Sequence, residues 1–148
     1  MGPEAKFYKK LVKEWSDFSF TRLENISLLG TPDLLVCNNN GHFFTIELKV
    51  TKGKKVRFSP HQLSFHIRHP KNTFILIQAL GPRSSNRFQM YRGSRILELD
   101  ASGLTLEACC LRPGSGARPV EGRRPMPQLM TGSLFPREFF LMFTVANI

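Results

Sequence analysis

Three side chains in the first third of the chain have the types that metal-dependent phosphodiester hydrolysis requires. Asp33 precedes an apolar run, and Glu47 and Lys49 alternate with apolar residues in the segment TIELKV (45–50). Side chains alternate between the two faces of a strand, so the glutamate and the lysine share one face. Two neighbouring carboxylates repel each other unless a cation lies between them, and oxygen ligands suit magnesium or manganese. If pairing brings Asp33 to Glu47, these residues predict nuclease chemistry in which Lys49 orients or deprotonates the attacking water.

That pairing depends on the turn between two predicted strands, 33–37 and 42–50. The sequence NNNG between them puts Gly41 at the last position of a three-residue loop, where a left-handed backbone favours glycine. Residue 38 then pairs with residue 42, and the same register sets Asp33 directly opposite Glu47. A four-residue loop would pair Asp33 with Ile46 instead. The position of Gly41 therefore predicts the carboxylate cluster.

Two helices are predicted beside this hairpin. Apolar residues recur at helical spacing over residues 3–15, and Glu4 projects near the centre of the apolar stripe. The second helix begins at SPHQ, with Ser59 as N-cap and Gln62 at the capping-box position. Each helix thus carries one polar side chain that we expect to face the hairpin.

The remaining strands complete an α/β fold. The run 72–80 is almost continuously apolar, as in a strand buried on both faces, and the succession strand, helix, strand implies a parallel crossover. The predicted core is a mixed sheet flanked by helices, in the order helix, three-stranded meander, helix, parallel strand. We also expect strands at 17–25, at RFQMYRG (87–93) and at RILELD (95–100).

Composition limits the class of protein. The 148 residues are sized for one domain, which we place at 1–111, followed by a Pro/Gly/Arg-rich linker and an apolar tail at 112–148. A formal charge of +10 favours a polyanionic partner, DNA first, over a membrane surface. The sequence has no signal-like or membrane-spanning apolar segment, so we expect a cytoplasmic protein with no membrane partner and no small-molecule cofactor.

The site residues also carry a family resemblance. The segment TPD, followed fourteen residues after its Asp by ELK, resembles the PD-(D/E)xK nuclease superfamily. The longer stretch from GTPDLLVC to SFHIRH is similar to phage-encoded VRR-type (VRR-NUC) endonucleases, which in turn resemble the archaeal Holliday junction resolvases. This resemblance covers roughly residues 3–80. It implies a restriction-endonuclease-like core, a magnesium or manganese ion, and hydrolysis of branched, nicked or flapped DNA in a phage-infected host cell.

The resemblance also implies roles for individual residues. Asp33 and Glu47 would bind the metal together with the backbone carbonyl of Leu48, and Lys49 would be the catalytic lysine. Glu4 matches the first-helix glutamate of the family, and Glu24 is a rival for this outer metal position. Gln62 would face the site and contact substrate or water. The candidate nucleic-acid-binding cations are Lys52, Lys54, Lys55, Arg57 and Arg22.

Two alternatives stay open in the sequence. One is a nucleic-acid-binding module that keeps the nuclease fold without turnover, and the other is a restriction-type enzyme that cuts plain duplex. A resolvase also needs paired active sites, so a homodimer is compatible with the first interpretation. Neither the choice between DNA and RNA nor the role of 112–148 follows from the residue pattern.

Overall fold

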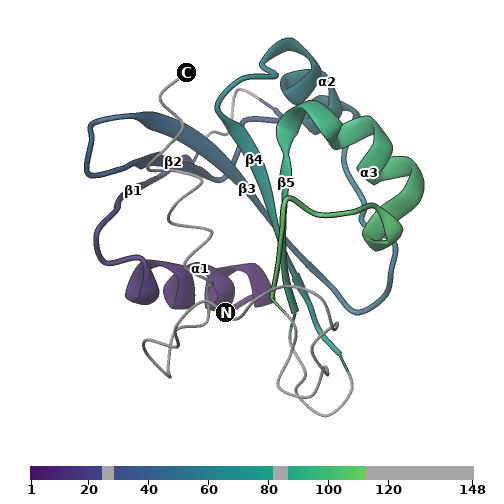
Figure 1. Cartoon of the computed structure of the whole chain (residues 1–148), viewed down its shortest axis with the longest axis horizontal. Coiled ribbons are helices and arrows are strands. Elements are labelled where there is room, and N and C mark those ends of the chain that lie inside the picture. The colour runs from purple at the N-terminus through teal and green to yellow at the C-terminus, as the bar shows by residue number, and fades with distance from the viewer. Residues whose placement is uncertain (25–28, 82–86, 113–148) are drawn as a thin grey trace, which may run out of the picture.

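The computed structural model describes residues 1–24, 29–81 and 87–112 (Figure 1). The predicted first helix and the capped second helix are both present, each within a residue or two of the expected bounds. In chain order the elements are α1 (Pro3–Glu14), β1 (Ser19–Arg22), β2 (Leu34–Cys37), β3 (Phe43–Thr51), α2 (Pro60–Arg68), β4 (Thr73–Ala79), β5 (Arg87–Arg92), the 3-10 turn η2 (Gly93–Arg95), α3 (Ile96–Ser102), the 3-10 turn η3 (Gly103–Thr105) and β6 (Cys110–Arg112).

The strands form one six-stranded sheet in the order β1-β2-β3-β4-β5-β6. All neighbouring pairs are antiparallel except β3 and β4, which run parallel and are joined through α2. Helix α1 covers one face of the sheet, and α2 and α3 cover the other (Figure 1). The predicted α/β fold, a mixed sheet flanked by helices, is confirmed.

Each face of the sheet has its own hydrophobic core. The core under α1, which we call the aromatic core, combines residues of α1 with alternate residues of the strands: Phe7, Leu11, Trp15, Leu34, Val36, Phe44, Ile46, Leu48, Phe74, Leu76, Phe88 and Met90. The smaller core under α2 and α3 contains Val56, Ile75, Ile77, Tyr91, Ile96 and Leu99. The central strands are therefore buried on both sides, as their continuous apolar sequences require.

The hairpin register agrees with the prediction. Gly41 has φ +78°, and Asn38 and His42 pair across the loop, with the Asn38 N–H donating to the His42 carbonyl at 3.0 Å. The side-chain oxygen of Asn38 also accepts from the backbone N–H groups of Asn40 and His42. The register that follows pairs Leu34 with Ile46, so Asp33 lies one residue beyond the last pair. The three-residue loop is confirmed.

The segment RILELD is not a strand, and this prediction was wrong. It forms α3, in which Ile96 and Leu99 are buried one turn apart while Leu97 is exposed. Over so few residues, apolar positions fit strand and helix periods equally well, and packing of Ile96 and Leu99 against the core selects the helix.

Two further differences concern the ends of the sheet. The strand expected at 17–25 is shorter, Ser19–Arg22, and an unpredicted strand, β6, pairs with β5 and ends at Arg112. The linker and apolar tail predicted at 112–148 lie, from residue 113 onward, outside the described residues. Within the described part of the chain, no helix has the length and apolar character needed to cross a membrane.

Candidate active site

Strand β3 presents Glu47 and Lys49 on the face covered by α2. Their neighbours Ile46 and Leu48 point the other way, into the aromatic core. Glu47 is 1% exposed, because β4 and α2 enclose it, and Lys49 Nζ lies 3.3 Å from Glu47 Oε1. The alternation of side chains along β3 thus places one ion pair, almost out of contact with solvent, at the centre of the sheet.

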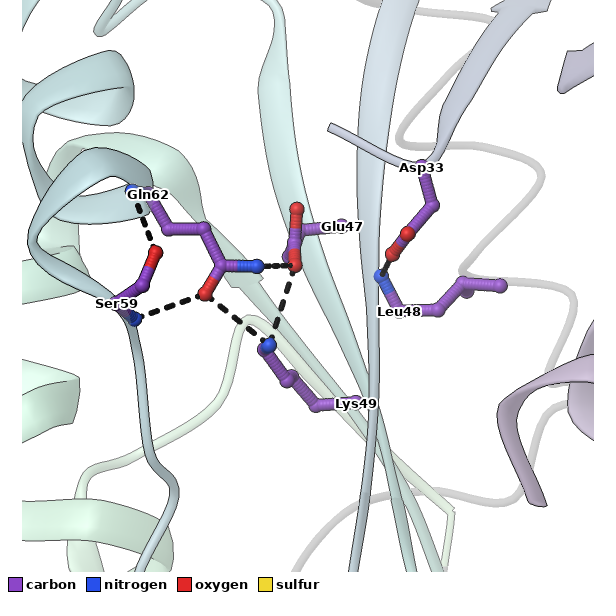
Figure 2. A network of polar contacts seen from close by, with 6 residues as sticks. All are labelled: Asp33, Glu47, Leu48, Lys49, Ser59 and Gln62. Atoms are coloured by element: carbon purple, nitrogen blue, oxygen red, sulfur yellow. Dashed lines mark hydrogen bonds and ion pairs between the residues drawn. The ribbon is translucent and has the colours of Figure 1, made fainter. Parts of the chain in front are cut away.

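Gln62 joins α2 to this ion pair. Its side-chain oxygen accepts from the Ser59 backbone N–H at 3.0 Å, and the Ser59 hydroxyl accepts from the Gln62 backbone N–H, which completes the predicted capping box. The same oxygen also accepts from Lys49 Nζ at 3.2 Å, while Gln62 Nε2 donates to Glu47 Oε1 (Figure 2). Capping and facing the site are therefore not alternatives for Gln62, because one amide does both.

Asp33 approaches β3 from the other side of the strand (Figure 2). Its Oδ2 accepts a hydrogen bond from the Leu48 backbone N–H at 2.7 Å. In a sheet, the N–H and C=O of one residue point to the same side of the strand. The Leu48 carbonyl therefore faces the side on which Asp33 lies, beyond the last β2–β3 pair, Leu34 with Ile46.

Burial dominates the electrostatics of the carboxylates. The pKa of Glu47 is raised to about 8, first by desolvation and then by the neighbouring Asp33, while Lys49 acts to lower it. The pKa of Asp33 is also raised, mainly by burial, against the lowering effect of the Leu48 N–H and then of Lys49 and Arg22. One ammonium does not offset two desolvated carboxylates, so the pair has an unmet demand for positive charge.

Glu4 and Glu24 differ in their relation to this pair. The pKa of Glu4 is raised, mainly by desolvation, and it is influenced by the charge of Lys49, which lowers it, and by the charge of Asp33, which raises it. The charge of Glu4 in turn raises the pKa of Glu47. Glu4 lies one turn before Phe7 on the same side of α1, exposed at the start of the helix but close enough to act on the site. Glu24 has a 79% exposed side chain and pairs with Arg22 at 3.6 Å. The geometry favours Glu4.

The donor set fits a small hard cation. Glu47 Oε2 is buried and has no hydrogen-bond partner among the described residues, whereas Oε1 already contacts Gln62 and Lys49. No group of three or more His, Cys, Asp or Glu residues in the described ranges is arranged to hold a metal ion. A set of two carboxylates and one carbonyl suits magnesium, because this ion commonly keeps several waters of its own.

The predicted basic residues lie around the site in two groups. The first group lies in the segment that follows the end of β3, and its members are all exposed: Lys52, Lys54, Lys55 and Arg57. Arg22 is exposed at the end of β1, where it lies over the Tyr8 ring at 5.7 Å and lowers the pKa of Asp33. None of these five side chains makes a hydrogen bond or ion pair with Glu47 or Lys49, and Arg22 acts on the site through the charge of Asp33.

Two residues that shape the site were missed from the sequence. Gly30, with φ +88°, packs against α2 so closely that an added Cβ would clash with the His61 carbonyl oxygen. This contact fixes the segment that carries Asp33 against the first turn of α2. Phe58 places its ring 5.6 Å from Lys49 Nζ. A glycine just before TPD was a possible signal for the first, and nothing in the local pattern marks the second.

Comparisons with known proteins give a likeness among solved structures and none among sequences. No protein-family model matches the chain, and no curated protein matches it at a significant level. The chain is similar to a solved structure of Archaeoglobus fulgidus Hjc, a Holliday junction resolvase from an archaeal hyperthermophile, with 20% sequence identity and a TM-score of 0.41. The similarity covers 57% of this chain and 74% of that one. The function is therefore argued from the geometry of the site itself.

Proposed function

We propose that this chain is a metal-dependent endonuclease that hydrolyses phosphodiester bonds in DNA. The observation that carries the proposal is the buried Glu47, whose Oε1 is held by Gln62 and Lys49 while Oε2 has no hydrogen-bond partner in the described structure. Burying a carboxylate oxygen without a hydrogen-bond partner is unfavourable unless a ligand such as a cation binds to it. A cation between Glu47 and Asp33 would do so.

The chain's own residues have distinct roles in this proposal. Asp33, Glu47 and the Leu48 carbonyl would hold magnesium or manganese, with Glu4 as an outer contributor. When bound, the ion would supply Lewis-acid stabilisation of negative charge on the reacting phosphate. Gln62 holds Oε1 of Glu47 in place, which leaves Oε2 preorganised to contact the ion.

Lys49 acts on the substrate side of the same cluster. Its ammonium lies 3.3 Å from Glu47 and 3.2 Å from the Gln62 oxygen, so it is held in place rather than free to rotate. From there it stabilises charge on the phosphate and orients the attacking water. The water oxygen bonds to phosphorus while the phosphorus–oxygen ester bond breaks, which leaves one phosphate monoester and one hydroxyl end.

We further propose that the enzyme selects branched, nicked or flapped DNA. Support comes from the net charge of +10, which favours contacts with the phosphate backbone. Backbone contacts report the shape of the nucleic acid rather than its base sequence. A second subunit would supply the second cut that resolution of a junction needs.

A cleavage panel tests this function. The substrates are a four-way junction, a flap, a nicked duplex, a plain duplex, a single strand and an RNA duplex, each with magnesium, manganese or chelator. We expect cleavage only with metal, and Lys49→Ala should lower its rate by at least about 1000-fold while DNA affinity changes by less than about threefold. Lys13→Ala, an exposed lysine on α1, is the matched control and should cleave normally.

The outcomes separate the competing functions. Binding that ignores magnesium, with no cleavage of any substrate, would replace the enzyme by a non-catalytic binding module. Equal rates on plain duplex and on junctions would remove structure selectivity and favour a restriction-type activity. Wild-type rates for Lys49→Ala would overturn the site.

A further inference from the structure

A cavity of about 220 Å³ lies beside the loop that follows β3. Its lining includes the cations Lys52, Lys54 and Arg87 together with the amide of Gln89, and none of the described lining residues is acidic. Among the described residues, ion pairs are recorded for other cations but for none of these three. The cavity therefore concentrates positive charge that no described residue neutralises, and its volume is many times the roughly 10–15 Å³ that one water needs.

The wall of this cavity is ordered by its own hydrogen bonds. The single hydroxyl proton of Thr51 is shared between the carbonyls of Lys55 at 3.0 Å and Gly53 at 3.2 Å, and Thr51 Oγ1 accepts from the Gly53 N–H. Leu104, which also lines the cavity, donates its N–H to the Lys54 carbonyl at 2.7 Å. Because these hydrogen bonds fix this backbone, the two lysines extend from a preformed turn.

Strand register places the cavity on the same face of the sheet as the candidate active site. Lys49 pairs with Ile77 on β4, and Ile77 pairs with Gln89 on β5, so the three residues form one row across the sheet. Side chains in one row point to the same face, and neighbouring strands lie about 4.8 Å apart, so the backbones at Lys49 and Gln89 are roughly 10 Å apart. The buried Ile77 separates them.

We propose that this cavity binds a backbone phosphate of the nucleic-acid strand, next to the phosphate that lies at Glu47 and Lys49. Every nucleotide carries a phosphate. A strand with one phosphate at the active site therefore has a further phosphate that can reach the cavity, roughly 10 Å away. Lys52, Lys54 and Arg87 provide charge, and the Gln89 amide provides a neutral donor. This inference rests on the proposed function and extends it, because it gives the path of the nucleic-acid strand beyond the active site.

The test compares two variants of equal charge. The cavity variant carries Lys52→Gln, Lys54→Gln and Arg87→Gln, and the control carries Lys9→Gln, Lys10→Gln and Lys13→Gln on the exposed side of α1. Fluorescence anisotropy with a labelled flap or junction DNA, in chelator and over a series of salt concentrations, gives the dissociation constant of each. We expect the cavity variant to bind at least about tenfold more weakly than wild type near 0.1 M salt. The slope of log affinity against log salt should be shallower by about one to two.

The control should bind within about threefold of wild type. An equal loss of DNA affinity in both variants would show a general charge effect and contradict a phosphate site in the cavity. Unchanged DNA affinity in the cavity variant would contradict it as well. Inorganic phosphate, titrated by NMR, distinguishes the source: loss of phosphate binding in the cavity variant with unchanged DNA affinity would make this a small-anion site and reject the strand path. Since these measurements use chelator, they stand even if no substrate is cleaved, whereas failure of the nuclease proposal appears only in the cleavage panel.

Discussion

The two faces of the sheet are built from the same strands and differ in what they bury. Under α1, alternate residues of β3 enter a core of aromatic and aliphatic side chains in which Phe7 contacts Phe88 and Phe44 contacts Phe74. On the opposite face the intervening residues of β3 are Thr45, Glu47 and Lys49.

The face under α2 and α3 buries polar atoms that have no hydrogen-bond partner among the described residues. Thr45 Oγ1, Glu47 Oε2 and both ring nitrogens of His66 are buried and have no hydrogen-bond partner within the described ranges. Desolvation lowers the pKa of His66 to about 4, with His69 as a second cause, so this imidazole is neutral at pH 7. Such groups reduce stability, so the comparison separates an apolar face that stabilises the fold from a face that buries polar atoms at a cost in stability.

The largest effect expected is on Glu47, and it has opposite signs for activity and for stability. Glu47→Gln removes the charge that holds the cation, so cleavage should fall at least about 1000-fold, while stability at pH 8.5 should equal or exceed that of wild type. The pKa of Glu47 is raised to about 8, so between pH 4.5 and 8 the folded state retains a proton that the unfolded state loses. The free energy of unfolding of wild type therefore falls as pH rises through this window, and the variant should lack that fall.

Thermal unfolding at pH 5.5 and 8.5 in chelator, beside cleavage assays with magnesium, measures both. Glu98→Gln is the matched control, because Glu98 is an exposed carboxylate paired with Arg95 at 2.9 Å. It should keep its activity. A Glu47→Gln variant that is less stable than wild type at pH 8.5 would mean that the site is structurally complete without a cation.

Truncation in the aromatic core should act on stability alone. Phe88 is 1% exposed, so Phe88→Ala should lower the free energy of unfolding by about 3 to 5 kcal/mol, through lost burial and a residual cavity. Cleavage per folded molecule should stay within about threefold of wild type. Phe43→Ala, at a side chain that is 59% exposed, should change stability by less than about 0.5 kcal/mol. Chemical denaturation gives the energies, and a large catalytic loss in folded Phe88→Ala would show that the two faces are coupled.

The smallest expected effects are those of two substitutions at the start of α2, which separate helix capping by Gln62 from its hydrogen bond to Glu47. Ser59→Ala removes the N-cap and should destabilise by about 1 kcal/mol without loss of cleavage. Gln62→Glu keeps the capping-box acceptor but cannot donate to Glu47, so it should retain the cap and lose activity at least tenfold. Denaturation and cleavage assays on both variants decide this. Equal activity in Gln62→Glu and wild type would reduce Gln62 to a helix cap.

Much of the fold could be predicted because its signals are local. The Asn38 and Gly41 turn, the Ser59 cap and the apolar run of β4 each specify backbone conformation through residues a few positions apart, and all three appear as expected. RILELD could not be assigned, because Ile96 and Leu99 become helical only when there is a core to bury them. The short strand β6 likewise depends on a partner, β5, that is distant in sequence.

The sequence by itself determined which residues could do chemistry and the hairpin register that brings Asp33 beside β3. These follow from residue type, the strand period of two and one turn. Only the tertiary structure decided that Glu47 is buried with an elevated pKa, that Gln62 caps a helix and holds Glu47 at once, and that Glu4 is electrostatically coupled to Glu47. Burial and electrostatic coupling arise from side chains far apart in the chain, and the residue pattern contains no distance between them.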